Sequence, residues 1–240
     1  MQQQSSPRRK RRFGKFLLVT FGVLAGLGVA AHLIWKYSGD GVPQLVVDED
    51  GIKVYKIKKS GSSLYTIKAT RVVDTSMDKA VSAMLDGSLE NCADWNPNCY
   101  VSRVVEPWDA KTSSYLQLWT QKMGSMLKPR EFLLRVNFSQ DPQTRSATVQ
   151  FKAEPDKLPP DDCCVRLSHM QSRWQFTPTP DGKVGVELLM DIDVGVPYFL
   201  FNAQAPNNVH WTFENLPRLF NQPRYDNAKV DWLLTSAAAP

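Results

Sequence analysis

The chain has 240 residues, enough for one domain of about 200 residues and an additional segment, and its formal net charge is +5. The charge is unevenly distributed, because residues 1–36 contain seven Lys or Arg and no Asp or Glu, whereas residues 37–240 contain 22 basic and 24 acidic residues. A nucleic-acid-binding domain concentrates positive charge on its own surface, so this distribution excludes nucleic acid as a partner.

The first 36 residues have the pattern of a membrane anchor. A basic segment at 1–15 precedes twenty residues without formal charge, Phe16 to Trp35. A helix of this length is about 30 Å long, which matches the hydrocarbon core of a bilayer. Because positive residues stay on the cytoplasmic side, we expect a basic cytoplasmic tail at 1–15, a transmembrane helix at 16–36, and the rest of the chain on the other side of the membrane.

Two other interpretations of this segment remain open. Val29-Ala30-Ala31 resembles the small-residue cleavage site of a signal peptide, although the apolar run is longer than the usual core of about 7 to 15 residues in such signals. A buried core helix is the third interpretation, which the apolar surface on all sides and the basic flank disfavour. The anchor and the signal peptide both export the domain.

The next elements are predicted from turn and capping residues. A linker is expected at 37–50, where glycines and a proline precede an acidic run. Two strands, at 51–58 and 64–73, are joined by a turn rich in Ser and Gly, which is typical of a hairpin. The capping sequence 74–76 predicts a helix, and a second short helix is expected to reach Trp95.

The remainder is predicted as strands followed by one long helix. The strands are expected at 100–106, 114–123, 131–138, 145–153, 165–176 and 183–194. After Pro197, which suits the first turn of a helix, apolar residues recur every three or four positions at Tyr198, Phe201, Ala205, Val209, Phe213, Leu216 and Phe220. The order of elements predicts an α+β fold with a curved antiparallel sheet around a long C-terminal helix, and 223–240 is expected to be a tail.

Several short strings, in this order along the chain, resemble the START (steroidogenic acute regulatory protein-related lipid-transfer) family. They are Trp95-Asn96-Pro97-Asn98, Pro129-Arg130-Glu131-Phe132, Val165-Arg166 followed by Arg173-Trp174, and Val196-Pro197 with Asn202. The resemblance covers about residues 51–222 and implies a helix-grip fold with a tunnel that holds one lipid or sterol molecule. An anchored, exported form resembles bacterial members, which implies an inner-membrane protein whose domain faces the periplasm.

Residues on the apolar faces of the predicted strands and helix are the candidates for the tunnel wall. They are Phe132, Leu134, Val136, Phe138, Val149, Phe151, Val186, Leu188, Met190, Ile192, Phe201, Val209 and Phe213. Alternation alone shows that each strand has one apolar face, so a solid core is an equal alternative. In 165–176 the alternation is interrupted by polar residues, and His169 and Arg173 are added as candidates for contact with a ligand head group.

No metal site, cofactor or catalytic group is predicted. The cysteines, Cys92, Cys99, Cys163 and Cys164, lack the spacing of a zinc site. For an exported domain, Cys92 with Cys99 is the first candidate for a disulfide, with free buried thiols as the alternative. His169 and His210 are the two histidines of the domain, and no hydrolase motif accompanies either of them.

The expected function is binding and transfer of a lipid or sterol-like molecule in an internal tunnel, outside the cytoplasm, by a protein that is not an enzyme. The expected partners are this hydrophobic molecule and a membrane, and no protein partner is predicted. The alternative is a helix-grip enzyme, a cyclase or hydrolase acting on a hydrophobic substrate, because one fold supports different functions.

Overall fold

The computed structural model describes the backbone of residues 7–234 and the side chains of residues 15–234. The predicted tails at 1–15 and 223–240 therefore lie partly outside the described residues. The chain forms two compact units, one made of residues up to Val42 with Lys58–Ser63, the other of Pro43–Ile57 with the chain from Leu64 onward.

The first unit contains a single long helix, α1 (Pro7–Tyr37). Its segment Lys15–Tyr37 has a mean hydropathy of 2.2, and within the described residues it is the one helix long and apolar enough to cross a membrane. A signal sequence near the N-terminus can also reach this length and hydropathy, so both exported interpretations remain. None of this segment is buried, and the interpretation as a core helix is therefore wrong.

The last turn of α1 is held by the loop at 58–63. The ammonium of Lys58, which is only 9% exposed, donates hydrogen bonds to the carbonyls of Lys36 (3.2 Å), Lys59 (3.3 Å) and Ser62 (2.6 Å). A cation at this position also complements the partial negative charge of a helix C-terminus. Gly39 packs so closely that an added Cβ would lie 2.3 Å from the carbonyl oxygen of Lys58, so this turn requires glycine.

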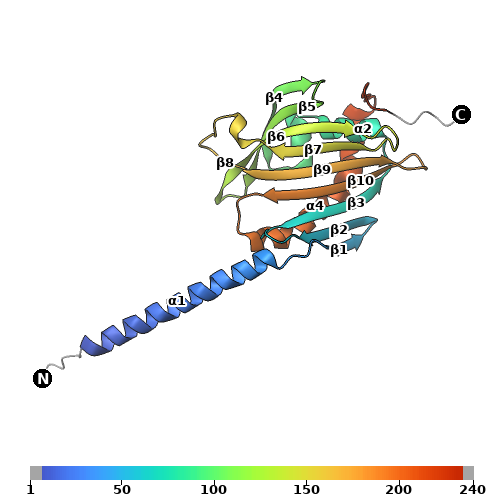
Figure 1. The fold of residues 1–240 in the computed structure, drawn as a ribbon. Helices are drawn as coiled ribbons and strands as arrows, with labels where there is room; N and C mark the ends of the chain where they lie inside the picture. The colour runs from blue at the N-terminus through green and yellow to red at the C-terminus, as the bar shows by residue number, and fades with distance from the viewer. Residues whose placement is uncertain (1–6, 235–240) are drawn as a thin grey trace. The chain divides into compact units, whose positions relative to one another are not determined.

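The second unit is built on one sheet of ten strands (Figure 1). The strands are β1 (Pro43–Glu49), β2 (Ile52–Lys58), β3 (Tyr65–Val73), β4 (Cys99–Asp109), β5 (Ser114–Met123), β6 (Leu127–Gln140), β7 (Ala147–Ala153), β8 (Val165–Arg166), β9 (His169–Pro178) and β10 (Val184–Asp193). Their order is β1-β2-β3-β10-β9-β7-β6-β5-β4, and the short β8 pairs in parallel with β6. The expected curved antiparallel sheet of an α+β fold is confirmed.

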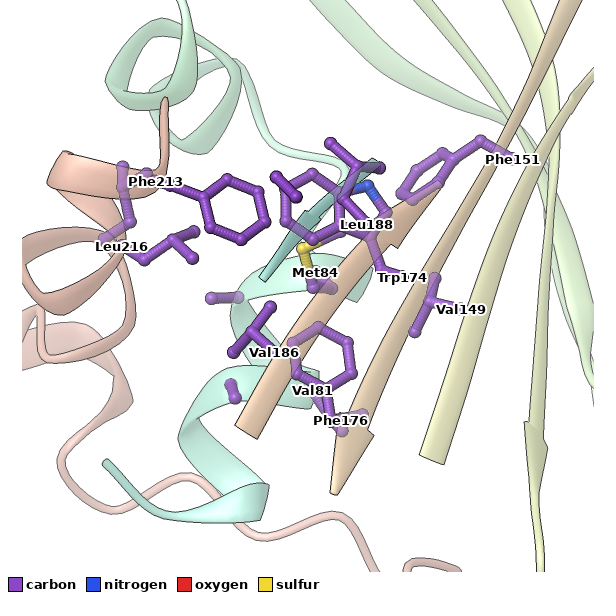
Figure 2. Close-up of a cluster of buried hydrophobic side chains, with 14 of the residues drawn as sticks. Val81, Met84, Val149, Phe151, Trp174, Phe176, Val186, Leu188, Phe213 and Leu216 are labelled. Carbon is purple, nitrogen blue, oxygen red and sulfur yellow. The ribbon is translucent and has the colours of Figure 1, made fainter. Parts of the chain in front are cut away.

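Three helices cover the inner face of this sheet: α2 (Met77–Leu85), α3 (Leu89–Trp95) and α4 (Tyr198–Phe220). Ser76 and Ser88 cap the first two, accepting hydrogen bonds from the backbone N–H groups of Lys79 (3.2 Å) and Asn91 (3.1 Å). Figure 2 shows Phe213 and Leu216 of α4 facing the side chains of the sheet across one apolar cluster. Burial of this cluster is the main stabilising contribution to the domain.

Three predicted boundaries differ from the structure. The linker expected at 37–50 contains β1, because backbone pairing with β2 forms a strand in spite of the nearby glycines and acidic residues. The tail expected at 223–240 is folded at least to residue 234: Tyr225 and Leu233 are buried, and Trp232 stacks on Trp108 at 5.2 Å. The strand expected at 165–176 is divided into β8 and β9, which pair with different neighbours.

A cavity beneath the C-terminal helix

A cavity of about 270 Å³, the inner chamber, lies between the sheet and the helices. Its wall is mainly apolar and aromatic. It is formed by Ala83, Met84, Asp86, Asn91, Cys92, Trp95, Asn96, Gln117, Trp119, Gln121, Phe151, Met170, Ser172, Trp174, Met190 and Thr212. All three helices and four strands contribute to it, so the chamber exists only in the folded domain.

A second cavity, the outer chamber of about 690 Å³, adjoins the inner one and lies against the N-terminal half of α4. It is lined by Trp95, Asn96, Pro97, Asn98, Gln121, Lys122, Met123, Leu127, Val194, Val196, Leu200, Phe201, Gln204, Ala205, Asn208, Trp211 and Thr212. Trp95, Asn96, Gln121 and Thr212 belong to both walls, so these four residues form the boundary between the chambers.

The boundary is positioned by a disulfide. Cys92 in α3 is bonded to Cys99 at the start of β4, which fixes the turn that carries Trp95 and Asn96. The indole ring of Trp95 packs edge-on against Trp174 with ring centroids 5.6 Å apart, and it is held by a hydrogen bond from its Nε1 to Asn91 Oδ1 (3.1 Å). The pairing of Cys92 with Cys99, the first candidate from the sequence, is confirmed, and Cys163 forms a second disulfide with Cys164.

Asp86 and Gln117 form a polar end of the inner chamber, apart from the polar residues at the boundary. The carboxylate of Asp86 accepts hydrogen bonds from the Tyr225 hydroxyl (2.7 Å) and from the backbone N–H of Ser88 (2.9 Å). The amide of Gln117, which is 4% exposed, donates to the Ser102 hydroxyl (3.0 Å). The polar groups at this end can hydrogen-bond a ligand, but most of them already have hydrogen-bond partners within the protein.

Tyr115 lies behind this polar end and is not part of the chamber wall. Its hydroxyl donates to the Leu85 carbonyl oxygen (3.1 Å) and lies 3.3 Å from Gln117 Oε1. Burial raises the pKa of Tyr115, and the negative charge of Asp86 adds to the effect. The phenol therefore stays protonated at neutral pH and is a hydrogen-bond donor rather than a base.

The helix that closes the chambers is fixed unequally along its length. Its C-terminal half buries Val209, Phe213 and Leu216, whereas Phe199 is 61% exposed and Leu200 is 46% exposed near its start. The change occurs close to Pro206, where the missing N–H removes one backbone hydrogen bond from the helix. The N-terminal half of α4 is the less buried part of the covering helix.

A buried arginine holds the turn that precedes α4. Arg130 is 4% exposed, and its guanidinium donates to the carbonyls of Val194 (2.6 Å), Gly195 (3.2 Å) and Lys128 (2.5 Å). The neighbouring Glu131 accepts from Arg166, so the two adjacent residues do not pair with each other. Neighbours in a strand point to opposite faces, which separates their side chains.

The predicted wall residues fall into three groups. Phe151 and Met190 line the inner chamber, and Phe201 lines the outer chamber. The others on the inner faces are buried in the surrounding apolar cluster rather than in the cavity lining: Phe132, Leu134, Val136, Phe138, Val149, Val186, Leu188, Ile192, Val209 and Phe213. They form the shell that supports the wall, and Figure 2 shows four of them, Val149, Val186, Leu188 and Phe213.

His169 and Arg173 do not line either chamber, which corrects their assignment to the ligand site. Both are exposed on the outer face of β9, where His169 pairs with Asp191 (3.1 Å) and Arg173 with Glu187 (3.4 Å). The alternation in β9 is in fact regular: Met170, Ser172 and Trp174 point inward. Ser172 is the polar residue on this inward face. Because it stands where an apolar residue is expected, the hydrophobic alternation of β9 is not visible in the sequence.

Sequence reasoning missed the part of the wall that β5 provides. Gln117, Trp119 and Gln121 face the chambers, whereas Leu116 and Leu118 point away and pack in a second apolar cluster with Leu133. The most apolar face of this strand is therefore the outer one. Hydrophobic alternation therefore indicates the wrong face of β5. The sequence feature that marks the chamber-facing side is Trp119 with Gln117 and Gln121 two residues away on either side.

The described residues contain no group of three or more His, Cys, Asp or Glu side chains arranged to hold a metal ion. The four cysteines are all joined in disulfides. The chemistry that the chambers offer is apolar contact, hydrogen bonding and the charge of Asp86, while Lys122 borders the outer chamber with its ammonium 5.8 Å from the centre of the Tyr100 ring.

Solved structures share this architecture. A STAR-related lipid transfer protein from Xanthomonas axonopodis matches with a TM-score of 0.68 and 22% identity, over 76% of this chain and 100% of that chain. Human STARD10 matches with a TM-score of 0.65 and 13% identity over 77% of this chain and 76% of that one. For human StAR-related lipid transfer protein 5 the TM-score is 0.64, with 14% identity over 85% and 98% of the two chains.

These identities are low, so the solved structures establish the fold alone. No curated protein matches the sequence. The family model of the START domain matches residues 40–197, which is more than half of the chain and includes every strand and the two short helices α2 and α3. The chain therefore belongs to the START domain family, whose members bind lipids and other hydrophobic ligands.

Proposed function

We propose that this protein is a membrane-anchored carrier that takes a lipid-like amphiphile from the bilayer into the two chambers and returns it or presents it to an acceptor. The observation that carries the proposal is the hollow under α4, formed by an inner chamber of about 270 Å³ and an adjoining outer chamber of about 690 Å³. The START domains of the family and the lipid transfer proteins of the same fold support it.

The energetics of such exchange require no covalent chemistry. Moving a CH₂ group out of water is favourable by about 0.8 kcal/mol, whether the group enters a bilayer or a protein. Met84, Phe151, Trp174 and Met190 offer an acyl chain an apolar environment comparable with the bilayer it leaves. The free energy of the lipid in the bilayer is then close to its free energy in the chambers. The rate of exchange is set by opening of the covering helix α4.

We place the domain outside the cytoplasm, in a bacterium on the periplasmic side of the inner membrane, with α1 as the anchor. The basic N-terminal segment and the length of the apolar helix support this orientation. Two disulfides support an oxidising compartment. A C-terminal fusion to alkaline phosphatase, which is active only after export, should be active, and activity of a fluorescent reporter that folds only in the cytoplasm would contradict this topology.

The carrier function is tested with the full chain purified in mild detergent. Organic extraction and mass spectrometry should recover lipid in proportion to protein, and the amount should fall by about one mole per mole in Ser172→Phe. Ser172 is 5% exposed and lines the inner chamber, so a phenyl ring at this position occupies the space of the ligand.

The matched control is Gln171→Phe, because Gln171 is the preceding residue of β9 and is exposed on the outer face. Lipid that surrounds α1 is present in both variants and cancels in the comparison. Equal lipid content in the wild type and Ser172→Phe would overturn the carrier function. Conversion of the bound molecule to a product during incubation would favour the alternative of a helix-grip enzyme.

A further inference from the structure

We propose that the Cys163–Cys164 disulfide is a redox-active site, which a protein dithiol reduces in the folded domain, and that its opening loosens the turn that leads into α4. The inference goes beyond the proposed carrier function, because neither the reduction nor its structural effect depends on a bound lipid. The partner that fits this site is a thiol–disulfide oxidoreductase with a pair of reactive thiols.

The two disulfides of the domain differ in their accessibility to such a partner. Every residue from Pro159 to Cys163 is exposed and Cys164 is half-buried, so this disulfide lies at the end of an exposed segment. Cys99, by contrast, is only 6% exposed, and Cys92 lies in the wall of the inner chamber. A thiolate must reach a sulfur atom to exchange with it, so exposure favours the bond between Cys163 and Cys164.

Loss of the Cys163–Cys164 bond costs the fold little. Adjacent cysteines close only the small ring that contains their own peptide bond, whereas Cys92 and Cys99 are 7 positions apart. The bond between adjacent cysteines therefore barely restricts the unfolded chain. An exposed disulfide is typical of labile, regulatory bonds rather than of structural ones.

The surroundings of Cys164 favour it as the leaving group. The Tyr100 hydroxyl lies 3.8 Å from Cys164 Sγ, and because a disulfide sulfur has no proton, the hydroxyl is the donor. The Lys122 ammonium lies 5.8 Å from the centre of the Tyr100 ring, and the Lys128 ammonium donates to the Asp162 carbonyl oxygen (3.2 Å). The hydrogen bond and the positive charges on this side stabilise a thiolate at Cys164, and a stabilised thiolate leaves faster.

The carboxylate of Asp161 lies beside the other cysteine, where it accepts a hydrogen bond from the Cys163 backbone N–H (2.9 Å). A negative charge disfavours a thiolate at Cys163, so we assign Cys163 Sγ as the atom attacked. One thiolate of the partner bonds to Cys163 Sγ, and the electron pair of the broken S–S bond goes to Cys164 Sγ, which takes up a proton. The second thiolate of the partner then attacks the partner's own sulfur and releases Cys163. The two cysteines gain two electrons and two protons, and the partner dithiol becomes a disulfide.

The disulfide is connected to the start of α4 through the sheet. Strand β8 begins directly after Cys164, and its first residue, Val165, pairs with Arg130 of β6. The guanidinium of Arg130 holds the carbonyls of Val194 (2.6 Å) and Gly195 (3.2 Å), in the turn before α4. Opening of the disulfide gives the backbone at Cys164 more freedom, which weakens the pairing of Val165 with Arg130 and the support of this turn.

The second residue of β8 is fixed independently of the disulfide. Arg166 binds the Glu131 carboxylate in a pair whose side chains are only 8% and 7% exposed. The backbone N–H of Leu167 also donates to the Glu131 carbonyl oxygen (2.9 Å). The effect of reduction is therefore confined to the first residue of β8 and the turn that its partner on β6 holds.

The test treats the full chain, in mild detergent, with dithiothreitol or with reduced thioredoxin, and traps free thiols by alkylation at successive times. Mass spectrometry of tryptic fragments separates the two sites, because residues 158–166 contain one disulfide and residues 80–103 contain the other. We expect the Cys163–Cys164 bond to open roughly a hundredfold faster, since the buried bond becomes accessible only by local unfolding. Equal rates, or a Cys163–Cys164 bond that neither reductant opens in the folded domain, would overturn the redox site.

Tyr100→Phe removes the hydroxyl beside Cys164 and should slow the reduction about fivefold, through loss of one hydrogen bond to the leaving thiolate. The matched control is Tyr55→Phe, because Tyr55 lies in β2, near the edge of the sheet opposite to β4. This control should keep the rate of the wild type. An unchanged rate in Tyr100→Phe would overturn the assignment of Cys164 as the leaving group.

Hydrogen exchange measures the effect on α4. The backbone N–H groups of Leu200 and Phe201 donate to the Pro197 carbonyl oxygen and close the first turn of the helix. We expect their protection to fall roughly threefold after reduction, while residues 213–216 are unchanged. The variant Cys163→Ser/Cys164→Ser should show the lower protection with or without reductant. Selective reduction without a change at Leu200 and Phe201 would overturn the coupling to α4.

Discussion

At the scale of single residues, the two disulfides have unequal consequences for stability. Cys92 and Cys99 are separated by 7 positions and close a loop, whereas Cys163 and Cys164 are adjacent and close none. In the chain-entropy model the first bond is worth roughly 2 to 3 kcal/mol, through its effect on the unfolded state. The second provides no comparable restriction of the unfolded chain.

We therefore expect Cys92→Ser/Cys99→Ser to lower the Tm of the domain by roughly 5 to 10 °C, and Cys163→Ser/Cys164→Ser to change it by less than about 2 °C. Tryptophan fluorescence of the full chain during heating is the measurement, since Trp95 and Trp174 are packed in the core near the first disulfide. An equal decrease in Tm in both double variants would contradict the explanation by loop closure.

Glu131 and Arg130 illustrate what local sequence cannot provide. Adjacent residues of opposite charge suggest an ion pair, but Glu131 binds Arg166 of β8, and Arg130 binds carbonyls at the end of β10. Both contacts join segments that are far apart in the sequence. The side chains of Glu131 and Arg166 are only 7% and 8% exposed, so loss of one partner would leave a buried unpaired charge.

At the scale of elements, α4 combines a well-packed half with a weakly packed one, and Pro206 lies at the junction. Pro206→Ala supplies the missing N–H and a residue with a helix propensity that is better by up to about 3 kcal/mol. We expect stronger protection of 198–205 from hydrogen exchange and lipid transfer that is slower by roughly tenfold, since opening of this half would cost more.

Pro217→Ala is the matched control, because Pro217 lies in the C-terminal half of the same helix, whose neighbours Leu216 and Leu219 are buried. This variant should gain helix stability without a change in the transfer rate. Similar slowing by both substitutions would show that α4 moves as one rigid helix. Hydrogen exchange and a fluorescent-lipid transfer assay on the full chain provide the two measurements.

Hydrophobic alternation predicts the buried face of some strands and not of others. In β10, Val184, Val186, Leu188 and Ile192 alternate with positions that include Glu187, Asp191 and Asp193, and this pattern predicts the buried face correctly, because one side of the strand faces the core and the other is more exposed to water. In β5 the outer face carries Leu116 and Leu118 and packs against other protein segments, so both faces are buried and the pattern carries no information about the cavity.

At the scale of the whole molecule, the sequence predicts the fold class and the order of the main elements, but only part of the cavity wall. Met84, Asn91 and Trp95 come from helices that contact the sheet through tertiary packing, which no local periodicity encodes. The strand β1 was missed for a similar reason: Leu45 is exposed and Val47 packs only partly against the core, so pairing with β2 rather than an apolar face marks this strand.

The presence of β1 shortens the connection between anchor and domain. Only residues 38–42 separate the end of α1 from the start of β1, and five residues span at most about 18 Å. If α1 spans a membrane, the domain is tethered close to it and cannot carry lipid through solution to a distant membrane. Transfer to a second membrane then requires that the two membranes approach each other.

We therefore expect the full chain, reconstituted in donor vesicles, to transfer fluorescent lipid to acceptor vesicles at a rate proportional to the acceptor concentration. Ser172→Phe in the same assay gives the background. A rate that is independent of acceptor concentration would show that the lipid or the domain leaves the donor membrane first, and would contradict the tethered mechanism.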